Sequence, residues 1–143
     1  MKFHYVVLAA AALVTACQGI AMPGRATSGQ TSSPQATTGI PEAAQGRWGL
    51  TAADCGPDAS IAKGLMVVDG TTLKFYESRA TLGKVAERSD TGIEADFAFT
   101  GEGMSWTRRE VLDLQDGGRT LVRREYGEGA IPGPLRYTAC DAV

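Results

Sequence analysis

Strict alternation of apolar and polar residues defines the clearest element of the chain, between residues 93 and 100. Four apolar side chains recur there at every second position: Ile93, Ala95, Phe97 and Phe99. Successive side chains of a β-strand point to opposite faces, so this period of two predicts a strand with one buried face.

Turn signals divide the rest of the chain after residue 40 into similar short segments. Asp69-Gly70 lies between two apolar runs and is typical of a β-hairpin, while Gly101–Gly103 and Asp116–Gly118 indicate two further turns. Residues 79–88 fit either a strand or an irregular segment. Strands are expected at residues 45–50, 65–68, 73–78, 93–100, 104–115, 119–127 and 135–140.

The succession of hairpins predicts an all-β fold. About seven or eight short strands are expected, and no segment shows sustained helical periodicity outside the first 16 residues. Hairpins produce an antiparallel sheet, and closure of that sheet removes its exposed edges. The sequence therefore predicts a small antiparallel β-barrel, with a β-sandwich as the alternative, and Trp48 and Trp106 as core residues.

One predicted strand carries charges on its apolar face. Met104 and Trp106 share a side of the strand with Leu112, but Arg108 and Glu110 fall on that same side. We therefore expect a β-bulge or a twist near residue 109.

The first 16 residues have the composition of a secretory signal peptide. Lys2 supplies a short basic region, and the stretch from Tyr5 to Val14 is almost wholly apolar. Such a stretch of about ten residues is too short to cross a bilayer, which requires roughly 20. Residues 17–40 are rich in Gly, Ser, Thr, Pro, Ala and Gln and predict a flexible tether, so the globular domain is expected at residues 41–143.

The end of the leader, Val14-Thr15-Ala16-Cys17, resembles the lipobox of bacterial lipoproteins. The resemblance implies that the leader is cleaved before Cys17 and that acyl chains on this residue anchor the protein in a lipid bilayer. Gln18 occupies the position at which aspartate signals retention in the inner membrane of enteric bacteria. The expected location is thus the outer membrane, on its periplasmic face.

Two cysteines remain when Cys17 carries lipid. In an exported protein, the pair Cys55 and Cys140 is expected to form a disulfide between the beginning and the end of the domain. The alternative is a redox site with two free thiols, but the chain lacks a Cys-x-x-Cys spacing.

Composition argues against several classes of function. The chain has 14 Lys and Arg, of which Lys2 lies in the leader, against 16 Asp and Glu, and its one histidine is His4. A slightly acidic mature chain without histidine predicts no nucleic-acid partner, no Ser-His-Asp or Cys-His catalysis and no metal or other cofactor. Ser60-Ile61-Ala62-Lys63 matches the Ser-x-x-Lys motif of β-lactamases, but the accompanying motifs are absent. We expect a protein that is not an enzyme.

A group of arginines is the candidate for binding a partner. Arg108, Arg109, Arg123 and Arg124 lie on two strands that are expected to pair around residues 116–118. They could bind an acidic protein partner. Alternatively, they and the neighbouring Glu110 and Glu125 form a solvated outer face with cross-strand charge pairs.

Several segments resemble one family of small alphaproteobacterial lipoproteins of uncharacterised type. They are GRWGLTAADC, LKFYESRATLGKV, FTGEGMSWTRREVLDLQDGGRTLVRREYG and RYTAC. The plan of lipobox, tether and small disulfide-bonded barrel is also similar to that of periplasmic metalloprotease inhibitors and membrane-bound inhibitors of c-type lysozyme.

These resemblances imply a lipid-anchored periplasmic binding module, in the form of a protease or lysozyme inhibitor or of an envelope-assembly factor. Two other functions stay open. One is a structural envelope lipoprotein without a specific ligand, and the other is a small enzyme that uses carboxylates.

Overall fold

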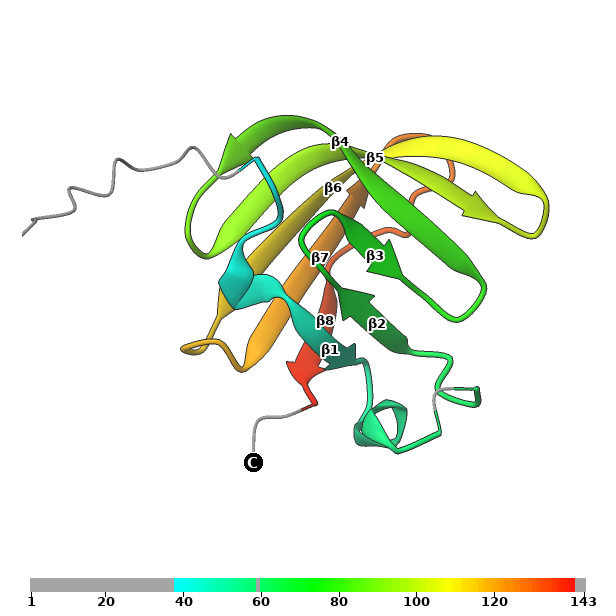
Figure 1. Cartoon of the computed structure of the whole chain (residues 1–143), viewed down its shortest axis with the longest axis vertical. Helices are drawn as coiled ribbons and strands as arrows, with labels where there is room; N and C mark the ends of the chain where they lie inside the picture. The colour runs from blue at the N-terminus through cyan, green and yellow to red at the C-terminus, as the bar shows by residue number, and fades with distance from the viewer. Residues whose placement is uncertain (1–37, 59, 141–143) are drawn as a thin grey trace, which may run out of the picture. The chain divides into compact units, whose positions relative to one another are not determined.

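Eight antiparallel strands form a closed barrel in the computed structural model, which describes residues 38–58 and 60–140 (Figure 1). Each strand pairs with its neighbours in sequence, and β8 pairs with β1. The expected barrel is thus confirmed. The strands are β1 (Gly46–Gly49), β2 (Leu65–Val68), β3 (Thr72–Lys74), β4 (Ser78–Arg88), β5 (Gly92–Gly101), β6 (Met104–Gln115), β7 (Thr120–Tyr126) and β8 (Leu135–Ala139).

The segment that fitted either a strand or an irregular structure is β4. Its pairing with β5 changes register between Leu82 and Val85 and again between Val85 and Glu87. Between these points Gly83 approaches β5 so closely that a Cβ atom would lie 2.8 Å from the carbonyl oxygen of Asp96. Only glycine allows this approach. The two register shifts beside it interrupt the alternation of inward and outward residues, so the sequence shows no clear period of two here.

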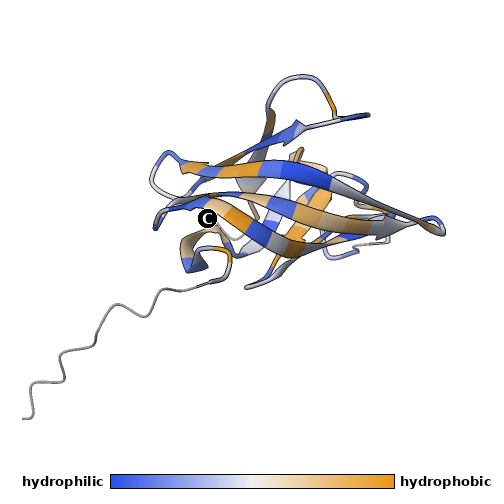
Figure 2. Ribbon diagram, turned by 90° about the horizontal axis from the view of Figure 1, so that it is seen from above, coloured by the Kyte–Doolittle hydropathy of each residue, from blue (hydrophilic) through white to orange (hydrophobic). Residues whose placement is uncertain are grey.

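The order of the strands separates the connections into two groups, one at each end of the barrel. We call one end the mouth; its connections join β1 to β2, β3 to β4, β5 to β6 and β7 to β8. The opposite end is the plugged end, which carries the turns at residues 69–71, 89–91 and 116–119. Apolar and polar residues alternate along the strands, as the colours of the ribbon in Figure 2 show. The apolar positions of β5 are the buried ones, and they belong to the hydrophobic core.

The chain just before β1 closes the plugged end. Here a short 3₁₀ helix, η1 (Glu42–Ala44), places Ala44 and the preceding Ile40 in the hydrophobic core. Trp48 Nε1 donates a hydrogen bond of 2.9 Å to the carbonyl oxygen of Ala44, and the amide of Ile40 donates to the carbonyl oxygen of Gly70. Trp48 is 2% exposed, which confirms its core role.

The described helical segments are η1 and η2 (Ala52–Cys55), and neither is long or apolar enough to cross a lipid bilayer. The predicted signal peptide, Cys17 and the tether up to residue 37 lie outside the described residues. The last two residues assigned to the tether that can be placed, Gly39 and Ile40, are part of the folded barrel: Arg88 Nε donates a 2.8 Å hydrogen bond to the carbonyl oxygen of Gly39.

The disulfide joins Cys55, at the end of η2, to Cys140, the residue after β8. Asp54 holds this region in place: one carboxylate oxygen accepts a hydrogen bond from the amide of Gly64, and the other accepts from the amide and hydroxyl of Thr51. These hydrogen bonds, that of the Thr51 hydroxyl first, lower the pKa of Asp54. The bridge therefore closes the β1–β8 seam of the barrel covalently.

Removal of this bridge should weaken the barrel strongly. The two cysteines are 85 residues apart, and the chain-entropy model assigns a loop of that length about 4–5 kcal/mol. We expect a Cys55→Ser/Cys140→Ser variant to show a free energy of unfolding lower by up to that amount in urea titrations. Wild-type protein with reductant should match the variant. Identical urea midpoints with and without reductant would contradict the prediction.

Candidate binding site at the barrel mouth

Four charged side chains lie inside the mouth half of the barrel. Strand β6 pairs with β5 from residue 104 to 113 without a register shift, so the β-bulge that was one of the two expectations near Arg109 is absent. Arg108 and Glu110 therefore point inward with the apolar residues of their strand. Glu110 is fully buried, and Arg123 on β7 is 4% exposed.

These side chains form one chain of alternating charge. Arg123 donates to both oxygens of Glu110, from Nε at 2.8 Å and from Nη2 at 3.0 Å. The same Nη2 lies 2.7 Å from Glu125 Oε1, and Arg108 Nη1 lies 2.8 Å from Glu125 Oε2. Buried ions are tolerated only when their partners replace the lost hydration, and the bidentate geometry supplies that replacement here. When both carboxylates are ionised, the network has two positive and two negative charges and is electrically neutral.

Three aromatic rings line the interior next to this network. Phe75, Phe99 and Trp106 are stacked in that order, with ring centroids 6.1 Å and 5.2 Å apart. Both arginines lie over this row, Arg123 at 4.6 Å from the Phe75 centroid and Arg108 at 6.0 Å from that of Phe99. Such cation–π contacts add to the ion pairs and fix the guanidinium planes.

The loop between β7 and β8, residues 127–134, is attached to the same network. Arg108 Nη2 donates to the carbonyl oxygens of Glu128 and Gly129, at 3.2 Å and 3.1 Å. The amide of Ile131 donates to Glu125 Oε2 at 3.1 Å. The position of this loop therefore depends on two of the four buried charges.

Exposed apolar side chains surround the mouth. Among the described residues, the large apolar side chains classed as exposed all belong to mouth-end connections or to the strand residues beside them: Leu50, Ile61, Tyr76, Met104, Tyr126 and Ile131. We call this set the apolar rim. Ile61 is 75% exposed and Met104 60%. Scattered exposed apolar residues are ordinary, but their restriction to one end of a barrel indicates a surface for interaction.

A pocket of about 620 Å³ opens beside the rim. Its wall is mainly apolar and includes Leu65, Val67, Phe75 and Tyr76, so it reaches the first ring of the aromatic row. A volume of this size is within the range of sites that hold a small molecule or a large side chain of a partner.

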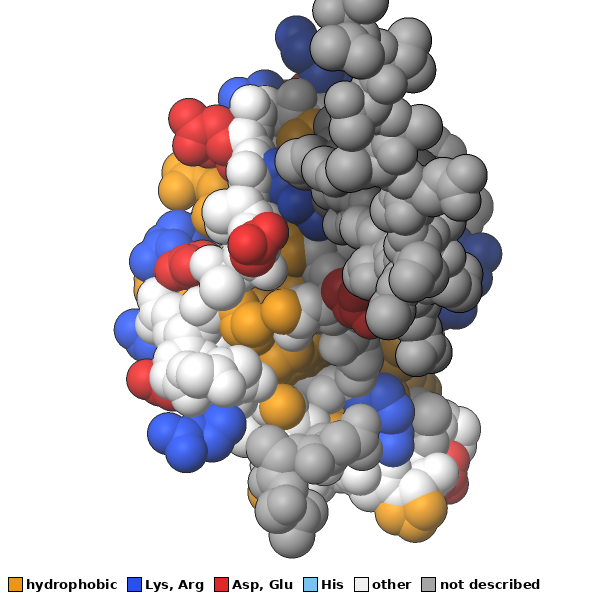
Figure 3. All heavy atoms as spheres, turned by 60° about the vertical axis from the view of Figure 1, so that its left-hand side comes forward, with side chains coloured by type: hydrophobic (Ala, Val, Ile, Leu, Met, Phe, Trp, Pro, Cys, Tyr) orange, Lys and Arg blue, Asp and Glu red, His pale blue; other side chains and the backbone are white. Residues whose placement is uncertain are grey.

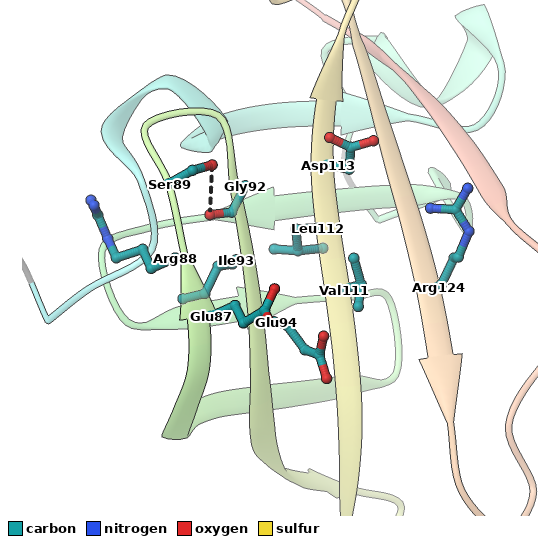
Figure 4. Close-up of a pocket in the computed structure, with 10 residues that line it drawn as sticks. All are labelled: Glu87, Arg88, Ser89, Gly92, Ile93, Glu94, Val111, Leu112, Asp113 and Arg124. Atoms are coloured by element: carbon teal, nitrogen blue, oxygen red, sulfur yellow. Dashed lines mark hydrogen bonds between the residues drawn. The ribbon is translucent and has the colours of Figure 1, made fainter.

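The surface away from the mouth is different in character. A pocket of about 270 Å³ near the β4–β5 turn carries both signs of charge, from Glu87, Arg88, Glu94, Asp113 and Arg124 (Figure 4). Basic and acidic side chains are likewise interspersed along the border of the face in Figure 3. Neither surface presents a charge of one sign to a ligand.

The four arginines that the sequence suggested for partner binding do not form one patch. Arg109 and Arg124 point to the outside of the barrel, and Arg109 is paired with Asp96 at 3.0 Å and with Glu94 at 3.2 Å. Arg108 and Arg123 point inward. The alternative of a solvated outer face is also wrong for Glu110, Arg123 and Glu125, which are buried.

Burial also changes the acidity of this site. Desolvation raises the pKa of Glu110 to about 7, although the attraction and hydrogen bonds of Arg123 oppose the shift. Burial raises the pKa of the neighbouring Tyr137 in the same way. Elsewhere the shifts have the opposite sign: hydrogen bonds, that of the Thr72 hydroxyl first, lower the pKa of Asp69 to about 2.

These shifts predict that the protein becomes less stable between about pH 4.5 and 7. The folded state binds a proton on Glu110 that the unfolded state has already lost in this window, so the free energy of unfolding falls as pH rises, by up to about 3 kcal/mol. The stabilising contributions of Asp54 and Asp69 are lost only below about pH 4.

Urea titrations at several pH values test this. A Glu110→Gln variant should lose the decline between pH 4.5 and 7, whereas a Glu94→Gln control, on the outer face, should retain it. The same slope in the Glu110→Gln variant as in the wild type would show that another group titrates.

No family model matches the chain, and no curated protein or solved structure is significantly similar to it. The site is therefore interpreted from its own geometry and chemistry.

Proposed function

We propose that this protein is a lipid-anchored lipoprotein of the bacterial envelope whose barrel is a non-enzymatic binding module for another periplasmic protein. The observation that carries the proposal is the apolar rim: the exposed large side chains are gathered at the mouth. Exposed apolar patches bordered by polar residues are typical of protein–protein interaction sites. An inhibitor of a protease or of lysozyme is one form that such a module takes.

The position at which the described chain enters the barrel supports this arrangement. Gly39 and Ile40 are held at the plugged end by Arg88 and Gly70, away from the rim. An anchor at Cys17 would thus be joined, through a tether of about 20 residues, to the end opposite the binding surface. A partner could contact the mouth without competing with the bilayer.

The anchor is tested by the intact mass of the protein purified from its native membrane. We expect the chain to begin at Cys17 and to carry acyl chains, whereas a Cys17→Ser variant should keep its leader and lack lipid. Circular dichroism should show the same β-structure in both proteins, because residue 17 precedes the barrel. An unmodified precursor as the main wild-type species would disprove the anchor.

The binding surface is tested by photocrosslinking in intact cells. A photoreactive amino acid at Ile61 or Met104 should give discrete protein adducts, because both positions project from the rim. The matched controls are Asp90 and Asp116, which are exposed at the plugged end and should give none. Equal adducts from both ends would contradict the rim as the binding surface. Absence of any protein adduct would favour the structural lipoprotein instead.

A further inference from the structure

Two buried N–H groups at the mouth have no hydrogen-bond acceptor among residues 38–58 and 60–140. They are Nε1 of Trp106 and Nε of Arg108, which lie two residues apart on the inward face of β6. The other tryptophan provides a contrast, since Trp48 Nε1 donates to the carbonyl oxygen of Ala44 at 2.9 Å. The barrel thus satisfies one indole at its plugged end and leaves the other unsatisfied at its mouth.

An unpaired buried donor is unfavourable. Such a donor loses its hydration without gaining an acceptor, and nearly all buried polar groups in folded proteins have a partner. Two such donors on neighbouring inward positions of one strand indicate a place where an acceptor binds. Every other nitrogen of Arg108 is occupied: Nη1 by Glu125, and Nη2 by the loop carbonyls of Glu128 and Gly129.

The surroundings define the chemistry of that acceptor. Above about pH 7, where Glu110 is ionised, the two positive charges of Arg108 and Arg123 are matched by Glu110 and Glu125, so an anion would leave the buried network with an excess negative charge. Phe99, stacked 5.2 Å from the ring of Trp106, offers an apolar face beside the donors. The site therefore suits an uncharged oxygen acceptor attached to an apolar group.

We infer that the mouth binds a peptide segment, whose main-chain carbonyl oxygens accept hydrogen bonds from Trp106 Nε1 and Arg108 Nε. This inference rests on the proposed function and specifies what the partner contributes: an uncharged stretch of polypeptide with an apolar side chain. Ile131 and Met104 of the apolar rim flank the same end and extend the contact.

Entry to the donors requires the loop at residues 127–134 to move. Three hydrogen bonds hold it to the charged groups of Arg108 and Glu125. Gly127, Gly129 and Gly133 all have positive φ, and most of the loop is exposed. Displacement of the loop therefore breaks few interactions, and the incoming carbonyls can replace those that Arg108 loses.

Nuclear magnetic resonance of the full chain tests the inference with a defined probe. The sequence contains two tryptophans, so two indole N–H signals are expected, and Trp48 serves as the internal reference. Addition of N-acetyl-leucinamide, a neutral amide, should shift the Trp106 signal downfield and leave that of Trp48 in place. Both titrations are made at about pH 8, where Glu110 is ionised. Acetate at the same concentration should then shift neither signal, because the charge network is balanced.

A Trp106→Phe variant provides the matched test, since it keeps an aromatic ring in the row and removes the indole N–H together with part of the indole surface. Affinity for the probe should fall about three- to tenfold, the loss expected for one neutral hydrogen bond. The loss of stability should be small, because some packing is lost but no hydrogen bond to the described protein is broken. Trp48→Phe, in contrast, should lower the stability, since it leaves the Ala44 carbonyl without its donor.

Three outcomes would overturn the inference. A Trp106 signal that is already hydrogen-bonded without probe, together with a destabilisation by Trp106→Phe as large as that by Trp48→Phe, would show that a trapped water occupies the donor. A shift with acetate but not with the amide would show that the site binds anions rather than neutral amides. No shift with either probe would show that the donors bind neither ligand. The amide probe takes the place of the unidentified partner, so these results do not depend on the crosslinking experiment. The rim can therefore fail as a protein-binding surface while the donors still bind an amide, and the reverse also holds.

Discussion

The bidentate pair between Arg123 and Glu110 is the interaction on which the mouth half of the barrel depends. Closure of the barrel forces every second residue of β6 and β7 into the interior, whatever its charge. A fully buried carboxylate is acceptable there only because a guanidinium contacts both of its oxygens. Glu125 and Arg108 then complete the network, and through Arg108 it determines where the 127–134 loop lies. Removal of Arg123 would leave the buried carboxylate of Glu110 without its partner.

The two halves of the barrel are therefore stabilised differently. At the plugged end, Ile40, Ala44 and Trp48 fill the interior with apolar groups, and the one indole N–H has its acceptor. At the mouth, charge pairing and stacked aromatic rings replace aliphatic packing. Buried ion pairs often add little net stability compared with an apolar core, because desolvation offsets their attraction. The less stabilised half is also the half that carries the exposed apolar rim, as is common for binding regions.

The sequence predicted the barrel well because its strongest signals are local. The alternation at residues 93–100 and the Asp69-Gly70 turn required no knowledge of distant contacts, and the even pair of cysteines predicted the bridge. The burial of Glu110 was missed for a different reason. The alternation along β6 places Glu110 on the apolar, inward side of the strand. Because charged side chains are rarely buried, a bulge or twist was expected to turn it outward. The signal that could have revealed this burial is the opposite charge of Glu110 on β6 and Arg123 on β7, which both fall at inward positions of paired strands.

Other features could not be derived from local patterns. The plug formed by Ile40 and Ala44 depends on tertiary packing, and its composition resembles the adjoining tether. The separation of Arg108 and Arg123 from Arg109 and Arg124 follows from the register of β6 and β7, which the sequence alone did not fix. The lipid on Cys17 stays a prediction from the leader, because that residue lies outside the described part of the chain.

The side chains that fill the interior of the barrel limit where a partner can bind. Barrels of eight strands have an interior just wide enough for side chains, or for one small ligand when those side chains are small. Here Phe97, Met66 and Leu112 fill the centre, and the charge network occupies the space toward the mouth. A ligand-carrying barrel would need that space empty. Such a filled barrel allows a partner to bind at the apolar rim. Inside the barrel, the partner can reach only the donors nearest the mouth, Trp106 Nε1 and Arg108 Nε.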